Sequence, residues 1–263
     1  MNFQREVRNR LAFMEQRIPR WVPAAAVLGL FAAWEAVCRS GLVSALFLPA
    51  PSAILTTGWD MLASGELAAN TAASLWRICA GFILGSAAGL LVGLAVGFSR
   101  LAEAVGNPVI YALYPIPKLA LLPLIILWLG IGEVSKITII SLGVFFPVVI
   151  NTYSGVKNVD PLLLKVAVSF KATRFSIIRK VVLPGALPVI FAGLKLAAGT
   201  ALLLLVAAEM IAAKEGIGAM VLHYGDLMLT TKLMVGVLTL SLLGFIFNYG
   251  LEWAERKIIP WKH

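Results

Sequence analysis

Three uninterrupted apolar runs limit what this chain can fold into. Residues 78–99, 137–156 and 233–251 contain no charged side chain. A helix needs about 20 apolar residues to cross the ~30 Å hydrocarbon core of a bilayer. The runs are continuous, and they are much longer than the alternating, roughly 10-residue strands of a membrane barrel. The pattern therefore predicts an all-α integral membrane protein.

Three further runs carry one charge each and complete a set of about six predicted transmembrane helices. Lys118 lies in residues 104–132, Lys195 in residues 187–208, and Glu35 near the end of residues 21–37. Hydrophobic residues make up 60% of the chain and charged residues 13%, which excludes a soluble globular domain. We expect one transmembrane domain over residues 21–256, between tails 1–20 and 257–263. Its predicted spans are residues 21–38, 69–98, 106–130, 136–156, 187–211 and 232–253.

Basic residues are distributed unevenly between the predicted spans, and their placement predicts orientation. The N-terminal tail, residues 157–186 and the C-terminal tail are all rich in Lys and Arg. Short cytoplasmic segments are enriched in these residues, so all three are expected in the cytoplasm, together with both termini. Membrane orientation thus explains the net charge of +9 better than nucleic-acid binding does. Because five spans follow the first one, we expect an uncleaved anchor there rather than a signal peptide.

Glycine recurs at every fourth position of the second predicted span. Four residues advance a helix by about 400°, so these glycines form one slowly drifting ridge. A ridge without side chains lets another helix approach closely. We interpret it as a helix-packing surface, and lining a translocation path is the alternative. The residues are Gly81, Gly85, Gly89, Gly93 and Gly97.

Prolines and a lysine make the third predicted span irregular. Each proline removes a backbone donor, and free backbone groups inside a membrane are tolerated only against protein or water. An ionisable residue there, Lys118, is a functional candidate by default, with snorkelling or pairing inside the bundle as the alternative. We hypothesise a positive point on an anion path. The depth of Glu209, near the outer interface, favours a structural role over proton relay. The candidate pathway residues are Tyr114, Pro115, Pro117, Lys118 and Glu209.

The segment at residues 157–186 is too apolar for a simple linker. Asp160 and Pro161 are typical of a helix start, with Asp160 as the N-cap and Pro161 at the first helical position. Apolar residues then share one face of the predicted helix, and a second short helix is expected to end at residues 183–184. A basic, amphipathic helix pair indicates either a docking surface or an interfacial helix on anionic lipid.

The chain contains no pattern for its own energy source or for catalysis. No glycine is followed by lysine, so a phosphate-binding Gly-x-x-x-x-Gly-Lys loop is absent from the sequence. Two histidines and two cysteines, all far apart, do not form a metal-ligand pattern, and no nucleophile motif is present. We therefore expect neither an enzyme nor a metal site, and no cofactor in this chain.

Several motifs resemble the inner-membrane permease subunits of binding-protein-dependent ABC importers, in the branch for nitrate, sulfonate, taurine and bicarbonate. The similarity covers nearly all of the chain after the first span. It lies in Phe47-Leu-Pro-Ala-Pro-Ser52, Ser74-Leu-Trp-Arg77, Gly81-Phe82, Pro115-Ile-Pro117, Leu122-Pro-Leu-Ile-Ile-Leu-Trp-Leu-Gly-Ile-Gly132, Leu183-Pro-Gly-Ala-Leu-Pro188, Gly193-Leu-Lys195 and Ala207-Ala-Glu-Met210.

The family signature in the cytoplasmic loop matches only in part. That signature is Glu-Ala-Ala, three residues, Gly, and a spacer ending in Ile-x-Leu-Pro. Alignment on Leu183-Pro184 places the signature glutamate at Lys165 and the signature glycine at Lys171. If Lys171 must adopt the left-handed conformation usual for glycine, the conformation costs about 1–2 kcal/mol. The coupling residues implied by the resemblance are Asp160, Leu163, Lys165, Val166, Ala167, Phe170, Lys171, Ala172 and Arg174.

The resemblance implies a type I importer fold and an assembly in the bacterial inner membrane. Two permeases, identical or different, would sit on two ATPase subunits that bind ATP and Mg, and an extracytoplasmic binding protein would deliver solute. The solute would be a small anion such as a sulfonate, taurine, nitrate, bicarbonate or a related organic anion. From the residues alone, the alternative is a secondary transporter or channel without an ATPase partner. Such proteins usually contain inverted repeats and buried coupling charges, whereas this sequence has no evident repeat and few charges within its predicted spans.

Overall fold

The computed structural model describes residue 19 and residues 21–262 of the chain, and every regular element in that part is helical. The N-terminal tail, except for residue 19, lies outside the described residues. The longer helices are α2 (Trp21–Arg39), α3 (Pro51–Ala63), α4 (Glu66–Phe98), α5 (Arg100–Leu113), α6 (Leu122–Leu129), α7 (Glu133–Lys157), α8 (Pro161–Ser169), α10 (Leu183–Ala212), α11 (Ile217–Asp226) and α12 (Thr230–Ile258). Short turns are η1 (Lys118–Leu121), α9 (Arg174–Ile177), η2 (Ile178–Val182) and η3 (Pro260–Lys262).

Four continuous helical segments of the described residues are long and apolar enough to cross a membrane. These are α4, α7, α12 and the run Arg174–Ala212, and a fifth span is possible if α5 and η1–α6 count as one. Helices α5 and η1–α6 do not form the single straight span expected at residues 106–130, because the chain bends by 86° between them. The bend lies at residues 114–117, where two prolines each lack the N–H that a continuous helix requires. The all-α membrane fold is confirmed, but the described residues provide four or five candidate spans instead of the six expected, because α2 (Trp21–Arg39), at the place of the first predicted span, is not among them.

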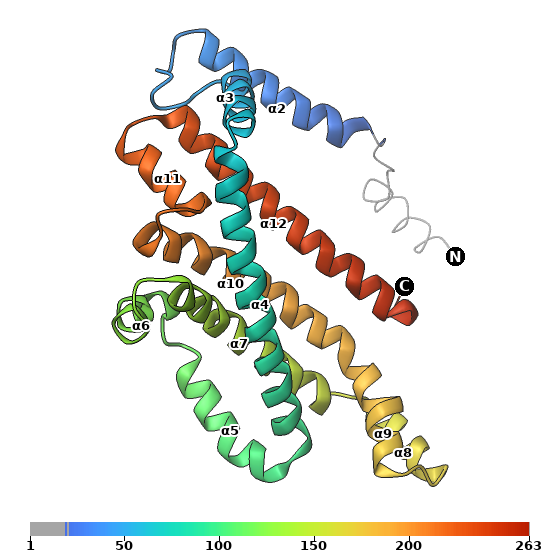
Figure 1. Ribbon diagram of the computed structural model, residues 1–263. Coiled ribbons are helices and arrows are strands. Elements are labelled where there is room, and N and C mark those ends of the chain that lie inside the picture. The colour runs from blue at the N-terminus through green and yellow to red at the C-terminus, as the bar shows by residue number, and fades with distance from the viewer. Residues whose placement is uncertain (1–18, 20, 263) are drawn as a thin grey trace, which may run out of the picture.

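The centre of the bundle is α7, which packs extensively on both α4 and α10, while α4 and α10 contact each other over a smaller area (Figure 1). All five glycines of the ridge on α4 face α7. A Cβ at Gly85 would lie 2.5 Å from the Ser141 carbonyl oxygen, and a Cβ at Gly93 would lie 2.6 Å from Cβ of Thr152. The two helices therefore approach to a separation that side chains would prevent.

A fully buried apolar core continues from α7 to α10. Ile140 and Val144 of α7 lie in one cluster with Ala201 and Leu205 of α10, and none of the four has any exposed surface. Ile78 extends the cluster to α4. The core thus lies between three helices that are well separated in sequence, and α3, α6, α11 and α12 add further buried residues to it.

Helix α2 extends away from this bundle and packs mainly on α3 (Figure 1). Its Glu35 carboxylate accepts hydrogen bonds from the backbone N–H of Ser52 at 3.0 Å and from the Ser52 hydroxyl at 2.6 Å. Arg39 pairs with the same carboxylate at 2.7 Å. The charge expected near the end of the first span thus joins α2 to the start of α3.

The structure corrects the predicted end of the short helix that precedes the fifth span. The chain remains helical from Arg174 to Ala212, instead of ending a helix at residues 183–184. Pro184 lies in the first turn of α10, directly after the π-helical turn η2. A widened turn before the proline accommodates the missing N–H without ending the helix.

Candidate translocation site and coupling surface

A cavity of about 560 Å³ lies between the bend after α5, α7 and α10. Its position follows from the bend, because the turn at residues 114–118 departs from the helix axis and leaves space against the neighbouring helices. Gly143 of α7 contributes to this space, since a Cβ there would collide with Cδ1 of Leu204. The lining residues are Tyr114, Ile116, Pro117, Lys118, Leu119, Gly143, Phe146, Pro147, Leu196, Thr200, Leu203 and Leu204.

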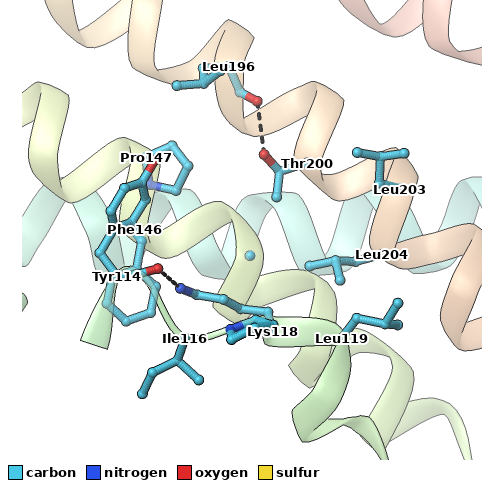
Figure 2. Close-up of a pocket in the computed structure, with 12 residues that line it drawn as sticks. Tyr114, Ile116, Lys118, Leu119, Phe146, Pro147, Leu196, Thr200, Leu203 and Leu204 are labelled. Carbon is cyan, nitrogen blue, oxygen red and sulfur yellow. Dashed lines mark hydrogen bonds between the residues drawn. The ribbon is translucent and has the colours of Figure 1, made fainter. Parts of the chain in front are cut away.

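Lys118 supplies the cationic group among these lining residues. Figure 2 shows its side chain pointing toward Tyr114 and Phe146, and its ammonium lies 4.3 Å from the centroid of the Phe146 ring. The ammonium also donates to the carbonyl oxygens of Tyr114 and, at 3.2 Å, of Leu113. Carbonyl oxygens and an aromatic face both stabilise a cation in apolar surroundings. The bend thus holds a half-buried positive charge at the cavity wall.

The opposite wall of the cavity is mainly apolar. It is formed by α10 through Leu196, Leu203 and Leu204, with Thr200 between them. The Thr200 hydroxyl donates to the Leu196 carbonyl at 3.2 Å, so its hydrogen is used within the helix (Figure 2). No acidic side chain is among the lining residues. This combination suits a small molecule with an anionic head and an apolar body.

The five candidate pathway residues do not all lie together. Tyr114, Pro117 and Lys118 line the cavity, whereas Pro115 lies in the same turn without lining it. Glu209 is fully buried elsewhere, at the far end of α10. Phe146 and Thr200 were not among the sequence candidates, because apolar and hydroxyl residues within a span resemble ordinary packing.

A buried charge network surrounds Glu209. Its carboxylate pairs with Nη1 of Arg77 at 2.8 Å, and it accepts hydrogen bonds from the Ser74 hydroxyl and, at 2.8 Å, from the Gly218 backbone N–H. The guanidinium also binds both carboxylate oxygens of Glu133, at 2.7 and 2.8 Å. These bonds join α4, α7, α10 and α11, so the network holds four helices together at one end of the bundle.

Glycine is required where the chain passes this network. Gly216 has a φ of +126°, and a Cβ there would lie 2.6 Å from Nη1 of Arg77. Sequence reasoning noted Arg77 and Glu209 separately and did not pair them. A charge inside a membrane requires a partner, which is a signal that Glu209 has one but does not identify it as Arg77.

The segment after α7 forms a small helical unit at the opposite end of α10 (Figure 1). Asp160 caps α8, as expected, by accepting the Leu162 N–H at 2.8 Å. Leu164 packs on a cluster that contains Val156 of α7 and Val182 before α10. The other implied coupling residues lie on α8, in the turn to α9 or, for Arg174, at the start of α9. Ala167 and Ala172 are half-buried, and the exposed ones are Leu163, Lys165, Val166, Phe170, Lys171 and Arg174.

Lys171 adopts the conformation that the signature alignment anticipates for glycine. Its φ is +52°, in the left-handed region, and its N–H donates to the Val168 carbonyl at 2.8 Å. The next N–H, of Ala172, donates to the Ala167 carbonyl at 3.1 Å. These bonds end α8 in the manner of a glycine-terminated helix, although the residue at the turn is lysine.

Comparison with known proteins places these features in a family. The family described as "Binding-protein-dependent transport system inner membrane component" matches residues 81–260. The chain is 38% identical to a permease protein of Bacillus subtilis named for aliphatic sulfonates transport, SsuC, covering 89% of this chain and 85% of the relative. It is 37% identical to the taurine transport system permease protein TauC of Escherichia coli, covering 88% and 86%.

A solved structure shares the fold. The MetNI methionine ABC transporter in an inward-facing conformation has a chain that aligns with a TM-score of 0.61 at 20% sequence identity, covering 72% of this chain and 94% of that one. At this identity the likeness concerns the fold alone. The family match over residues 81–260 covers most of this bundle. The chain belongs to the inner-membrane permease components of binding-protein-dependent ABC importers, within the group that includes sulfonate and taurine permeases.

Proposed function

We propose that this chain forms the solute pathway of an ATP-driven importer for a small aliphatic sulfonate. The observation that carries the proposal is the cavity whose lining combines one ammonium group, from Lys118, with an apolar wall from α10. A sulfonate would place its charged oxygens near Lys118 and its short carbon chain against Leu203 and Leu204. The sulfonate and taurine permeases among its relatives support this substrate class.

The proposed assembly contains two permeases, two ATPase subunits and an extracytoplasmic binding protein. The ATPases would hold ATP and Mg, since the sequence lacks a phosphate-binding loop of its own. The unit formed by α8 and α9 would dock on an ATPase, and both termini would lie on that cytoplasmic side. The exposed Phe170 supports docking, because 82% of its surface is accessible in the single chain.

Lys118→Gln tests the pathway directly. The purified complex is reconstituted into liposomes with its ATPase and binding protein, and uptake of radiolabelled taurine is measured with ATP inside the vesicles. We expect uptake to fall at least tenfold, because glutamine keeps a similar length and removes the charge. Lys118→Arg should retain part of the activity. Lys214→Gln, an exposed lysine outside the cavity lining, is the matched control.

Two results would contradict the proposal. Wild-type uptake by Lys118→Gln, with an unchanged preference for the sulfonate over a neutral analogue, would remove Lys118 from the pathway. Uptake that continues without ATP, or with an inactive ATPase, would instead support a secondary transporter or channel.

A further inference from the structure

The helical unit of α8 and α9 exposes an unusual combination of side chains. Lys165, Lys171 and Arg174 are exposed, and so are Arg179 and Lys180 just beyond them. Within the described residues, none of these five cations forms an ion pair. Asp160 is the one acidic residue in the segment, and its carboxylate caps α8. The unit therefore presents a concentrated positive charge without internal compensation.

Exposed apolar side chains lie on the same side of α8 as one of these cations, Lys165. On α8, Leu162 and Val166 are exposed and lie one turn apart, and Lys165 lies three residues after Leu162, so all three share one side of the helix. Leu164 lies on the other side and packs on the cluster that joins α7 to α10. The mixed surface thus lies on the side of α8 opposite the contact of Leu164 with this cluster.

This arrangement favours a protein partner over a lipid surface. An interfacial helix buries its apolar face in the bilayer and keeps its cations on the opposite face. Here the apolar and basic side chains point together, away from α7 and α10. A protein groove with an apolar floor and a charged rim can bind both kinds of side chain at once.

We propose that the ATPase partner of this permease receives α8 in a groove whose rim carries carboxylates opposite Lys165 and Lys171. This inference rests on the proposed function and adds the chemistry of the partner surface. The apolar floor would receive Val166 and Phe170. The charge also selects the partner, because an ATPase that presents a cation to the signature glutamate would repel Lys165.

Zero-length cross-linking of the intact complex tests the proposal. The native permease–ATPase complex is extracted in mild detergent and treated with a water-soluble carbodiimide, which joins an ammonium to a carboxylate in direct contact. Mass spectrometry should identify a peptide linking Lys165 or Lys171 to an Asp or Glu of the ATPase. An assembled complex without such a link contradicts the acidic groove.

Charge reversal gives an independent measurement. In affinity purification at physiological salt, we expect the double variant Lys165→Glu/Lys171→Glu to copurify with at most one tenth of the ATPase that copurifies with the wild-type permease. Lys257→Glu, an exposed lysine at the end of α12, should retain the wild-type amount. Replacing the cross-linked ATPase carboxylate with lysine should restore assembly of the double variant, which also shows that this variant is folded.

Other outcomes separate this inference from the proposed function. A wild-type complex without any ATPase would overturn both. An ATPase that stays fully bound to the double variant would overturn only the acidic groove. A double variant that keeps its ATPase but loses binding to phosphatidylglycerol vesicles would assign the cations to the membrane surface and would also overturn the groove.

Discussion

Lys171 has a backbone conformation that most side chains avoid. Its φ of +52° places it in the left-handed region, where the Cβ approaches the following carbonyl group. The signature alignment anticipated this conformation, since it places a family glycine at this position. The structure therefore shows that the turn is kept and that the lysine adapts to it.

Replacing Lys171 with glycine should stabilise the turn between α8 and α9. Glycine removes the strain of about 1–2 kcal/mol but gains some entropy in the unfolded chain, so we expect a net gain of up to about 1 kcal/mol. Hydrogen exchange of the Ala172 amide, which donates to Ala167, should slow up to about fivefold. The measurement uses the solubilised permease without its ATPase, which removes any effect on docking.

Lys171→Val provides the opposite control for this experiment. A β-branched residue tolerates the left-handed conformation poorly, so exchange at Ala172 should become faster than in wild type. Equal exchange rates for glycine, lysine and valine would show that the backbone at this position is not strained.

At the scale of elements, the apolar runs located the helices well but did not give their geometry. The fourth predicted span, residues 136–156, lies within α7 (Glu133–Lys157) because a buried run must end near the first charged residues. The prolines near residue 115 predicted irregularity in the third span, but not the 86° bend. A proline removes one backbone hydrogen bond and crowds the preceding turn, which allows a bend there. The direction that the chain then takes depends on packing against α7 and α10.

The interface between α4 and α7 gives a prediction at this scale. A Cβ at Gly85 would lie 2.5 Å from the Ser141 carbonyl oxygen and 2.8 Å from Cβ of Val144. Because neither neighbour is the flexible end of a side chain, Gly85→Ala must push the helices apart, and we expect a loss of about 1–3 kcal/mol. Reversible unfolding in detergent measures this loss.

Gly199→Ala is the matched control, because it makes the same change in α10 where no atom lies within 4 Å of the added Cβ. It should leave stability unchanged or slightly raised, since alanine favours helix. An equal loss for both variants would mean that helix propensity, and not the close approach to α7, determines the effect.

At the scale of the whole molecule, pairing between distant residues could not be predicted from one sequence. Arg77 and Glu209 are 132 residues apart, and the apolar run that leads to Glu209 also contains Lys195. Each of these charged side chains needs a partner inside the membrane, but the sequence does not say which other residue supplies it. The cavity shows the same limit, because Lys118 was recognised from its own run while Phe146 and Thr200 join it only through the packing of α7 and α10.

Removing one member of the charge network should weaken the whole bundle. Arg77→Met leaves the buried Glu209 carboxylate without its cationic partner, and we expect a loss of about 3–5 kcal/mol. Arg77→Met combined with Glu209→Gln should be more stable than Arg77→Met alone, because the unpaired charge is gone. Thermal unfolding of the detergent-solubilised variants measures both. Strictly additive losses would show that the two side chains are not coupled.

The continuous helix from Arg174 to Ala212 gives the molecule a lever. Its 39 residues span about 58 Å at 1.5 Å per residue. The lever begins in the exposed unit next to α8 and ends beside the Arg77–Glu209 pair, and Thr200 and Leu203 lie along it on the cavity wall. If the helix tilts as one body by about 5° around its α9 end, the end at Glu209 moves by about 5 Å. A small change of tilt at the α9 end, next to the proposed docking surface, would thereby become a displacement of several ångströms at the opposite end of the bundle, and the cavity wall would move with it.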